Sequence, residues 1–109
     1  MRQHLLVTRD AAGGWVLAGL FDFEPAMRGA YEYEFAAVGV FGSEGDPRFL
    51  RRCLTAYGYR DDQLDHGLSR RLLAWTLLHY YSNLPGYLRH LPPPAEPELD
   101  ALAARWFGC

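Results

Sequence analysis

The stretch HLLVTRDAAGGWVLAGLFDF, residues 4–23, decides how this sequence begins to fold. Its two ends, HLLVT and WVLAGLF, are apolar and rich in branched or aromatic side chains, which favours β-strands. The segment between them contains Asp10 and the pair Gly13-Gly14, which are typical of a turn. Pro25 then ends the second run, because proline cannot donate a hydrogen bond to a strand ladder. The sequence therefore predicts a β-hairpin over residues 4–21.

The remainder of the chain follows helical periodicity. Residues 31–41 fit both a strand period and a helix face, and their length favours a helix, since strands average about five or six residues. Asp46-Pro47 is typical of an N-cap followed by a first-turn proline, and Gly58 is a stop signal. The expected helices cover residues 31–41, 47–57, 62–82 (capped by Asp61 or Asp62) and 97–107, with one short turn at 87–90. The predicted fold class is mainly α (α+β), a β-hairpin followed by four helices.

Length and composition limit the number of domains and the class of function. The chain has 109 residues, of which 50% are hydrophobic, so we expect a single domain or part of one. Within it we expect a hairpin segment over residues 1–24 and a helical subdomain over residues 25–109. The net charge of −2 gives no basic surface for nucleic acid or anionic membranes. All 11 basic residues are arginine, which excludes lysine-based chemistry within this stretch.

The ends of the chain and its cysteines bear on location. Residues 1–10 lack the basic and apolar regions of a secretory signal, and no apolar run approaches the length of a membrane span. Cys53 and Cys109 are far apart in sequence and show no metal-binding spacing. We therefore expect a cytoplasmic protein with no membrane partner and no disulfide.

Asp22 is the strongest candidate for chemistry. It ends the second strand between two phenylalanines, and a carboxylate held there could bind Mg²⁺, which prefers hard oxygen ligands. A turn or capping aspartate is the competing interpretation. If the two strands pair, Asp22 should lie close to His4 across the base of the hairpin.

The order of these motifs resembles a known family. Leu20-Phe21-Asp22-Phe23, followed by Glu32-Tyr33-Glu34-Phe35-Ala36, is similar to the C-terminal half of the aminoglycoside phosphotransferase family, which shares the protein-kinase-like fold. The resemblance covers roughly residues 3–90. It places Asp22 on the magnesium aspartate of the family. It places Glu34 where the family usually carries an aspartate that braces the catalytic loop.

The sequence also departs from the family pattern. His4 occupies the position of the second metal-ligand asparagine. An imidazole there could bind the cofactor by donating a hydrogen bond to a phosphate, and an ordinary surface histidine near a chain end is the competing interpretation. Glu24 stands where a glycine is usual, which adds a carboxylate near the metal site. The catalytic aspartate of the family would lie five residues before His4, upstream of Met1, so the resemblance assigns no catalytic residue to this chain. The glycine-rich loop and the phosphate-holding lysine are likewise missing.

The resemblance implies Mg²⁺ and ATP or GTP as cofactors, and a small-molecule substrate with a hydroxyl acceptor. It predicts a chain that is inactive alone and whose exposed lobe face favours self-association. A non-catalytic helical module for binding or assembly is the alternative. The acids near the two helix starts are interpreted as capping residues, with a role in binding a cationic substrate as the other option; they are Glu44, Asp46, Asp61, Asp62 and Asp65.

Overall fold

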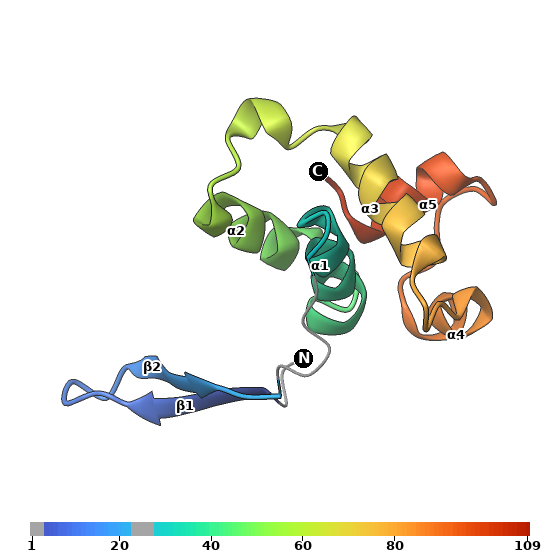
Figure 1. Cartoon of the computed structure of the whole chain (residues 1–109). Coiled ribbons are helices and arrows are strands. Elements are labelled where there is room, and N and C mark those ends of the chain that lie inside the picture. Colours follow the sequence, from blue (N-terminus) through green and yellow to red (C-terminus); the bar gives the residue numbers. More distant parts are fainter. Residues whose placement is uncertain (1–3, 23–27) are drawn as a thin grey trace.

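The computed structural model describes residues 4–22 and 28–109, and it consists of a β-hairpin beside a helical body (Figure 1). This confirms the predicted fold class. The elements in chain order are β1 (Leu5–Arg9), β2 (Trp15–Leu20), α1 (Glu32–Ala37), a π-helical turn η2 (Val38–Gly42), α2 (Pro47–Tyr57), a 3₁₀ turn η3 (Asp61–Gln63), α3 (His66–Leu78), α4 (Leu84–His90) and α5 (Leu99–Trp106). The expected boundary between hairpin and helical segments at residue 24 falls outside the described residues.

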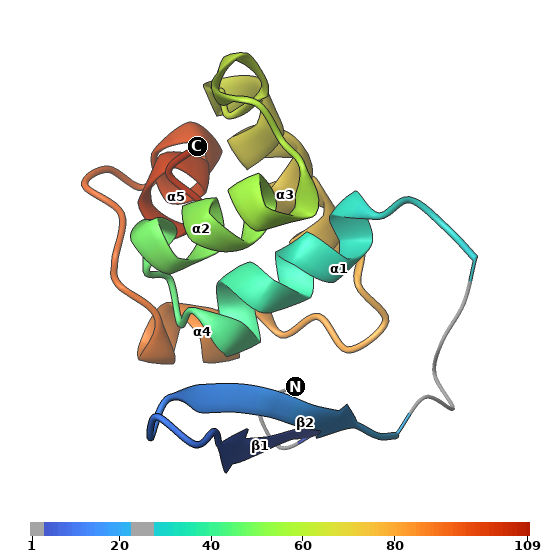
Figure 2. The ribbon, with the colours of Figure 1, turned by 90° about the vertical axis from the view of Figure 1, so that its left-hand side faces the viewer.

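The turn of the hairpin is stabilised by side-chain hydrogen bonds to its backbone amides. The Asp10 carboxylate accepts hydrogen bonds from the amides of Ala12 and Gly14, at 3.0 and 2.7 Å. Gly13 adopts a positive φ of 82°, which glycine tolerates without strain. The two strands pair antiparallel with a β-bulge. Figure 2 shows the hairpin beside the helices, and both strands remain solvent-exposed except for Gly19, which is half-buried.

The helical body is built around α3. Helices α1 and α5 both pack on α3, and α2 packs against η2. The largest fully buried side chains of the described core are Leu50, Leu54, Leu68, Leu72, Trp106 and Phe107. These residues come from α2, α3 and the C-terminal helix, so residues more than 50 positions apart in the sequence share one core. The body therefore has its own apolar interior, which the hairpin does not enter.

The helix boundaries agree with the expected ones at α2 and differ at α3. Asp46 caps α2 by accepting from the Arg48 amide at 3.0 Å, and Gly58 ends this helix with a φ of 120°. Helix α3 is the longest, as expected, but it begins later than residue 62, because Asp65 is its cap and accepts from the Leu68 amide at 2.7 Å. The acids expected to cap it lie in η3 instead.

Two further boundaries correct the expectations. The segment that begins at Asn83 was expected to interrupt the helical pattern and leave one short turn at 87–90. Asn83 instead caps α4, accepting from the Gly86 amide at 3.1 Å, and Pro85 fits the first turn of that helix. Helix α5 starts at Leu99, two residues after the expected Pro97. In the described part of the chain, no helix combines the length and apolarity that crossing a bilayer would require.

Candidate functional site

The base of the hairpin brings His4 and Asp22 together, as the strand pairing predicts. The Phe21 amide donates to the His4 carbonyl at 3.1 Å, which closes the ladder just before Asp22. The His4 Nε2 atom then lies 3.3 Å from Asp22 Oδ2. This contact is an ion pair only when the imidazole is protonated. The strand pairing therefore places a carboxylate oxygen and an imidazole nitrogen side by side at one end of the hairpin.

The backbone of Asp22 departs from strand geometry. Its φ is 69°, in the left-handed region that non-glycine residues rarely adopt, although aspartate is among the residues that tolerate it. The side chain remains 43% exposed, so its carboxylate is open to solvent. The Phe21 ring lies beside the imidazole, with 5.8 Å between the two ring centroids. An open carboxylate at a strand end, oriented by a neighbouring imidazole, can bind a cation.

The side chains of His4 and Asp22 do not form a complete metal site, but Asp22 could supply one of the ligands of Mg²⁺. In the described residues, no three His, Cys, Asp or Glu side chains gather as they would around a metal ion. A site made of protein ligands alone is therefore not built there. Mg²⁺, however, is usually held by one or two carboxylates together with waters and substrate phosphates. Asp22 fits that arrangement as a single oxygen ligand, whereas the imidazole of His4 is a poor ligand for Mg²⁺.

Among the described residues, no hydrogen bond or ion pair joins the other predicted site residue, Glu34, to this pair. Glu24 lies outside the described residues. Glu34 is exposed on α1, and among the described residues its carboxylate makes no ion pair. The predicted bracing role of Glu34 therefore has no bonded partner to support it in this structure, and it stays a prediction.

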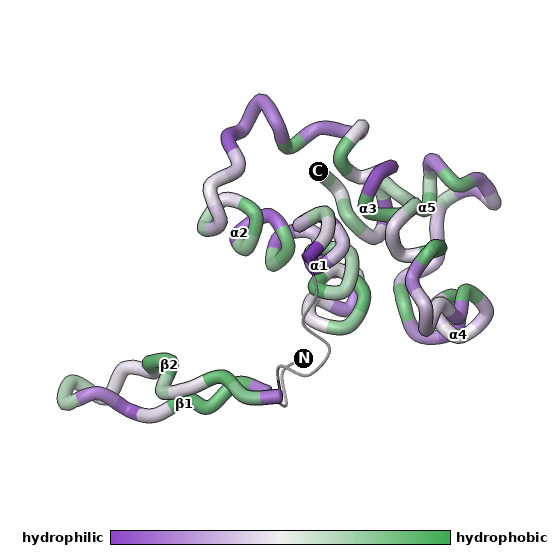
Figure 3. The backbone as a smooth tube through the Cα atoms, in the orientation of Figure 1, coloured by the Kyte–Doolittle hydropathy of each residue, from purple (hydrophilic) through white to green (hydrophobic). Residues whose placement is uncertain are grey.

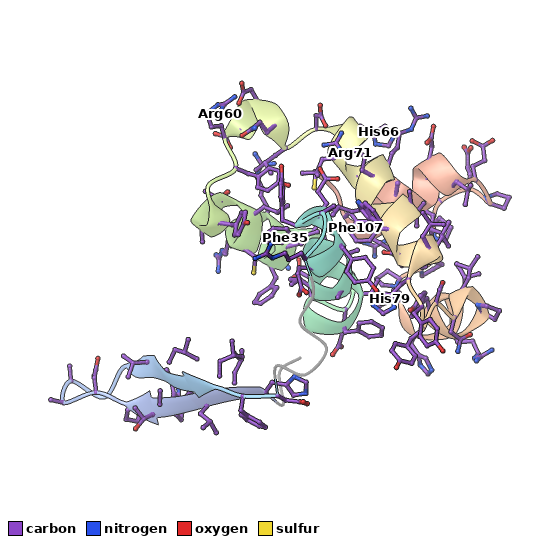
Figure 4. All side chains as sticks on the ribbon, viewed as in Figure 1. Phe35, Arg60, His66, Arg71, His79 and Phe107 are labelled. Atoms are coloured by element: carbon purple, nitrogen blue, oxygen red, sulfur yellow. The ribbon has the colours of Figure 1, made fainter. Side chains whose placement is uncertain are left out.

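The neighbouring acid on α1 has a clear partner that the sequence did not reveal. The Arg71 Nε atom of α3 donates to both carboxylate oxygens of Glu32, at 3.0 and 3.2 Å, and the Glu32 side chain is only 16% exposed. Figure 4 labels Arg71 on α3, and its side chain remains about half exposed. This pair fixes α1 against α3. An acid such as Glu32 is recognisable in the sequence as a typical first-turn residue of a helix. No local pattern identifies its partner, which lies 39 residues away in the sequence.

Two further arginines of the helical body, Arg51 and Arg70, contact acids while remaining partly exposed. Arg70 makes a bidentate contact to Asp100, at 2.7 and 2.6 Å, and this bond holds the pKa of the Asp100 carboxyl below its usual range. Arg51 contacts Asp61 at 3.0 Å. Four of the five acids near the helix starts thus serve as caps (Asp46 and Asp65) or contact arginines (Asp61 and Asp62), which favours a structural interpretation of these four over substrate binding.

The aromatic side chains near the end of α2 pack mainly on each other. The rings of Tyr31 and Tyr57 stack with centroids 5.9 Å apart, and Phe35 meets both Tyr57 and Tyr59 edge-on. The hydroxyl of Tyr59 is buried and finds no hydrogen-bond partner within the described residues. Burial raises the pKa of Tyr59, and the nearby Tyr31 and Glu32 raise it further. This cluster is part of the helical body and lies outside the hairpin site.

The fold and the site together define a structural class. A hairpin that ends in a solvent-open aspartate beside a histidine, joined to a helical body, is a scaffold that presents one carboxylate and one imidazole at the same place. The comparison of the sequence with family models identifies the chain more closely: the model of the phosphotransferase enzyme family matches residues 1–73, and the chain belongs to that family. No curated protein and no solved structure matches this chain at a significant level of similarity.

Proposed function

We propose that this chain is the C-terminal portion of an aminoglycoside-phosphotransferase-like kinase that transfers phosphate from ATP or GTP to a hydroxyl of a small molecule. Membership of the phosphotransferase family supports the reaction class. One observation carries the proposed site, namely the Asp22 carboxylate at the end of β2, 3.3 Å from His4 Nε2. The order of motifs, with the hairpin first and the helices after it, supports the C-terminal placement.

Asp22 would hold Mg²⁺ together with the nucleotide phosphates. When bound, Mg²⁺ neutralises charge on the transferring phosphate. His4 would keep the Asp22 carboxylate in position, since an imidazole that donates to a carboxylate restricts its rotation. His4 can also donate a hydrogen bond to a phosphate oxygen, which is the cofactor-binding role proposed for it. Glu24 and Glu34 would act near this site through their charge and their support of neighbouring segments.

The same argument makes the chain inactive alone. Phosphoryl transfer depends mostly on positioning and on charge stabilisation, and those parts are spread over a whole kinase-like fold. Loss of a general base forfeits about 10²- to 10⁴-fold in rate. A lone carboxylate binds Mg²⁺ weakly when no phosphate completes the shell. We therefore place the acceptor-activating base and the phosphate clamp in a segment upstream of Met1.

The test compares the 109-residue chain with a version extended upstream in its gene. Calorimetric titration with Mg·ATP and Mg·GTP should show no saturable binding to the short chain at about millimolar nucleotide, roughly −4 kcal/mol of binding free energy. The extended chain should bind nucleotide and turn over. Asp22→Asn should abolish turnover of the extended chain and leave the short chain unchanged.

A matched control removes an acid away from the hairpin. Asp62 is an exposed carboxylate in η3, paired with Arg60 at 3.1 Å on the far side of the helical body in Figure 4, and Asp62→Asn should leave turnover of the extended chain intact. Turnover by the short chain that Asp22→Asn abolishes would contradict the proposed inactivity. Nucleotide turnover by the extended chain that survives Asp22→Asn would contradict the role of Asp22.

A further inference from the structure

The β-bulge sorts the side chains of the hairpin into two unequal faces. Strand β1 advances by one residue from Leu6 to Val7, while its partners on β2 advance from Gly19 to Leu17, so Ala18 is the extra residue. Residues that pair across a ladder share a face. The pairs Leu5–Leu20, Val7–Leu17 and Arg9–Trp15 therefore lie on one face, and Leu6–Gly19 and Thr8–Val16 on the other.

The bulge is what makes the first face continuous. In a regular ladder, Val7 would pair with Ala18, and both Leu17 and Trp15 would turn to the opposite face, because side chains alternate along a strand. With the bulge, five large apolar side chains share one side; we call this the hairpin apolar face, and it consists of Leu5, Val7, Trp15, Leu17 and Leu20. Figure 3 shows hydrophobic stretches along both strands of the hairpin. The β-bulge at Ala18 is therefore the backbone feature that brings these side chains to one face.

This face is uncovered and large. Its side chains are 45% exposed at Leu5, 57% at Val7, 66% at Trp15, 65% at Leu17 and 51% at Leu20. An aromatic side chain carries roughly 150–250 Å² of surface and an aliphatic one less, so the five side chains together expose on the order of 500 Å². That is near the upper limit for a patch on a monomer, about 300–600 Å². Two such faces together would bury about 1,000 Å², which is the lower limit for a biological interface.

A groove opens at the base of the same face. It has a volume of about 580 Å³ and lies between Leu5 of the hairpin and residues of η2 and α2, among them Val38, Phe49 and Cys53. Asp46 also lines it, and the carboxylate of this residue is 43% exposed. The groove therefore combines apolar walls with one carboxylate, which also contacts the Arg48 guanidinium at 3.3 Å.

The tip of the hairpin carries the complementary group. The Arg9 guanidinium lies 3.9 Å from the centroid of the Trp15 ring, so the two side chains form one cationic, aromatic unit. Arg9 also donates to the Gly13 carbonyl, which holds its side chain in place. Arg9 is the only charged residue of β1 and β2. Tryptophan and arginine are the residues that most often anchor protein interfaces.

We propose that two copies of this chain associate about a two-fold axis near Val7 and Leu17, with their hairpin apolar faces in contact. The ladder supports this symmetry, because Val7–Leu17 is the middle pair of the face, with Leu5–Leu20 on one side and Arg9–Trp15 on the other. Rotation about that centre places the tip of each copy over the base of its partner. Trp15 then enters the groove against the partner's Phe49, and Arg9 faces the partner's Asp46. This association does not depend on the phosphotransferase chemistry.

Sedimentation equilibrium of the 109-residue chain without nucleotide or metal tests the proposal. We expect a dimer of about 25 kDa, twice the 12.4 kDa of one chain. Leu17→Glu places two like charges beside the axis and should weaken the dimer at least about 100-fold. Leu6→Glu is the matched control, since Leu6 is 55% exposed but lies on the opposite face, and it should leave the dimer intact. Far-ultraviolet circular dichroism checks that both variants keep their helices.

The charge pairing has its own test. Arg9→Ala and Asp46→Asn should each weaken the dimer by roughly two- to fivefold, and the double variant should be weakened no more than the stronger single variant. Asparagine preserves the cap of α2, so the second change removes charge without removing the helix start. A wild-type chain that stays monomeric at about 100 µM overturns the proposal, since even weak specific dimers form there. Equal effects of Leu17→Glu and Leu6→Glu, or a dimer that survives Leu17→Glu, also overturn it and would leave the face to another occupant, such as a segment of a longer chain.

Discussion

Gly39 should tolerate no side chain, because a ring from the other end of the chain occupies the space beside it. Gly39 is buried in η2, and a Cβ atom there would lie 2.5 Å from Phe107 Cε1 and 2.8 Å from Phe107 Cδ1. Phe107 is fully buried, so its ring has little room to move aside. The Gly39 carbonyl also accepts the Ser43 hydroxyl at 2.7 Å, which ties this turn to its present geometry. Gly39→Ala is therefore an overpacking change at a point where η2 meets the C-terminal segment (Figure 4).

Two opposing effects set the size of the loss. Overpacking a well-filled core costs typically 1–3 kcal/mol, that is, about 2 kcal/mol here. Replacing a helical glycine by alanine returns roughly 0.5–1 kcal/mol through reduced backbone freedom of the unfolded chain. The net loss in the free energy of unfolding should be about 1–1.5 kcal/mol. For a domain of this size, that lowers the melting temperature by roughly 4–12 °C.

Thermal and urea unfolding followed by circular dichroism at 222 nm measure this loss, because the signal comes from the helical body. Gly29→Ala is a matched control, since nothing lies within 4 Å of a Cβ atom at Gly29, and its stability should change by less than about 0.5 kcal/mol. In a Phe107→Leu background, which removes the ring atoms concerned, Gly39→Ala should cost less than it does in the wild type. A stabilising effect of Gly39→Ala, or an equal cost in both backgrounds, would refute the reasoning.

Three further changes test the helical body. Asp65→Ala removes the cap of α3 and should cost about 1 kcal/mol in urea unfolding, whereas Asp65→Asn should cost much less. Arg70 lowers the pKa of Asp100, so their contact contributes stability above about pH 4 that is lost as the pH falls through the lowered pKa; Asp100→Asn should flatten the acid limb of a stability–pH curve. Trp106→Phe removes the indole donor 2.9 Å from the partly buried Pro92 carbonyl and should cost about 1 kcal/mol, measured by chemical unfolding.

Local signals in the sequence were sufficient for the hairpin and for α2. Asp46-Pro47 and Gly58 mark the two ends of α2 by cap chemistry alone, and the two apolar runs around Gly13 specify antiparallel strands. The closeness of His4 and Asp22 follows from that pairing. These features depend on residues a few positions apart or across one turn, which is the range over which sequence patterns are informative.

Features that depend on long-range packing were not predictable in the same way. Asp61, Asp62 and Asp65 are all acceptable caps by type, and only the packing of α3 selects Asp65. The Arg70–Asp100 contact joins residues 30 positions apart, so no periodicity reveals it. The β-bulge that places five side chains on the hairpin apolar face was also not predictable from strand alternation. A strict period of two puts Leu17 and Trp15 on the opposite face, and the bulge shifts them by one residue.

The proposed magnesium site and the proposed dimer interface both involve the hairpin. Main-chain bonds at its base hold His4 and Asp22 together, but no residue of β1 or β2 is buried against the helical body, so hairpin packing does not determine where the pair lies relative to that body. A metal-binding carboxylate that must meet a nucleotide needs placement to about 0.5 Å, which comes from packing of the element that carries it. The hairpin apolar face is the surface on which such packing would act. The hairpin apolar face can contact only one partner at a time. An upstream segment that completes the phosphotransferase by packing on this face would therefore exclude the dimer. The dimer would then form only when that segment is absent.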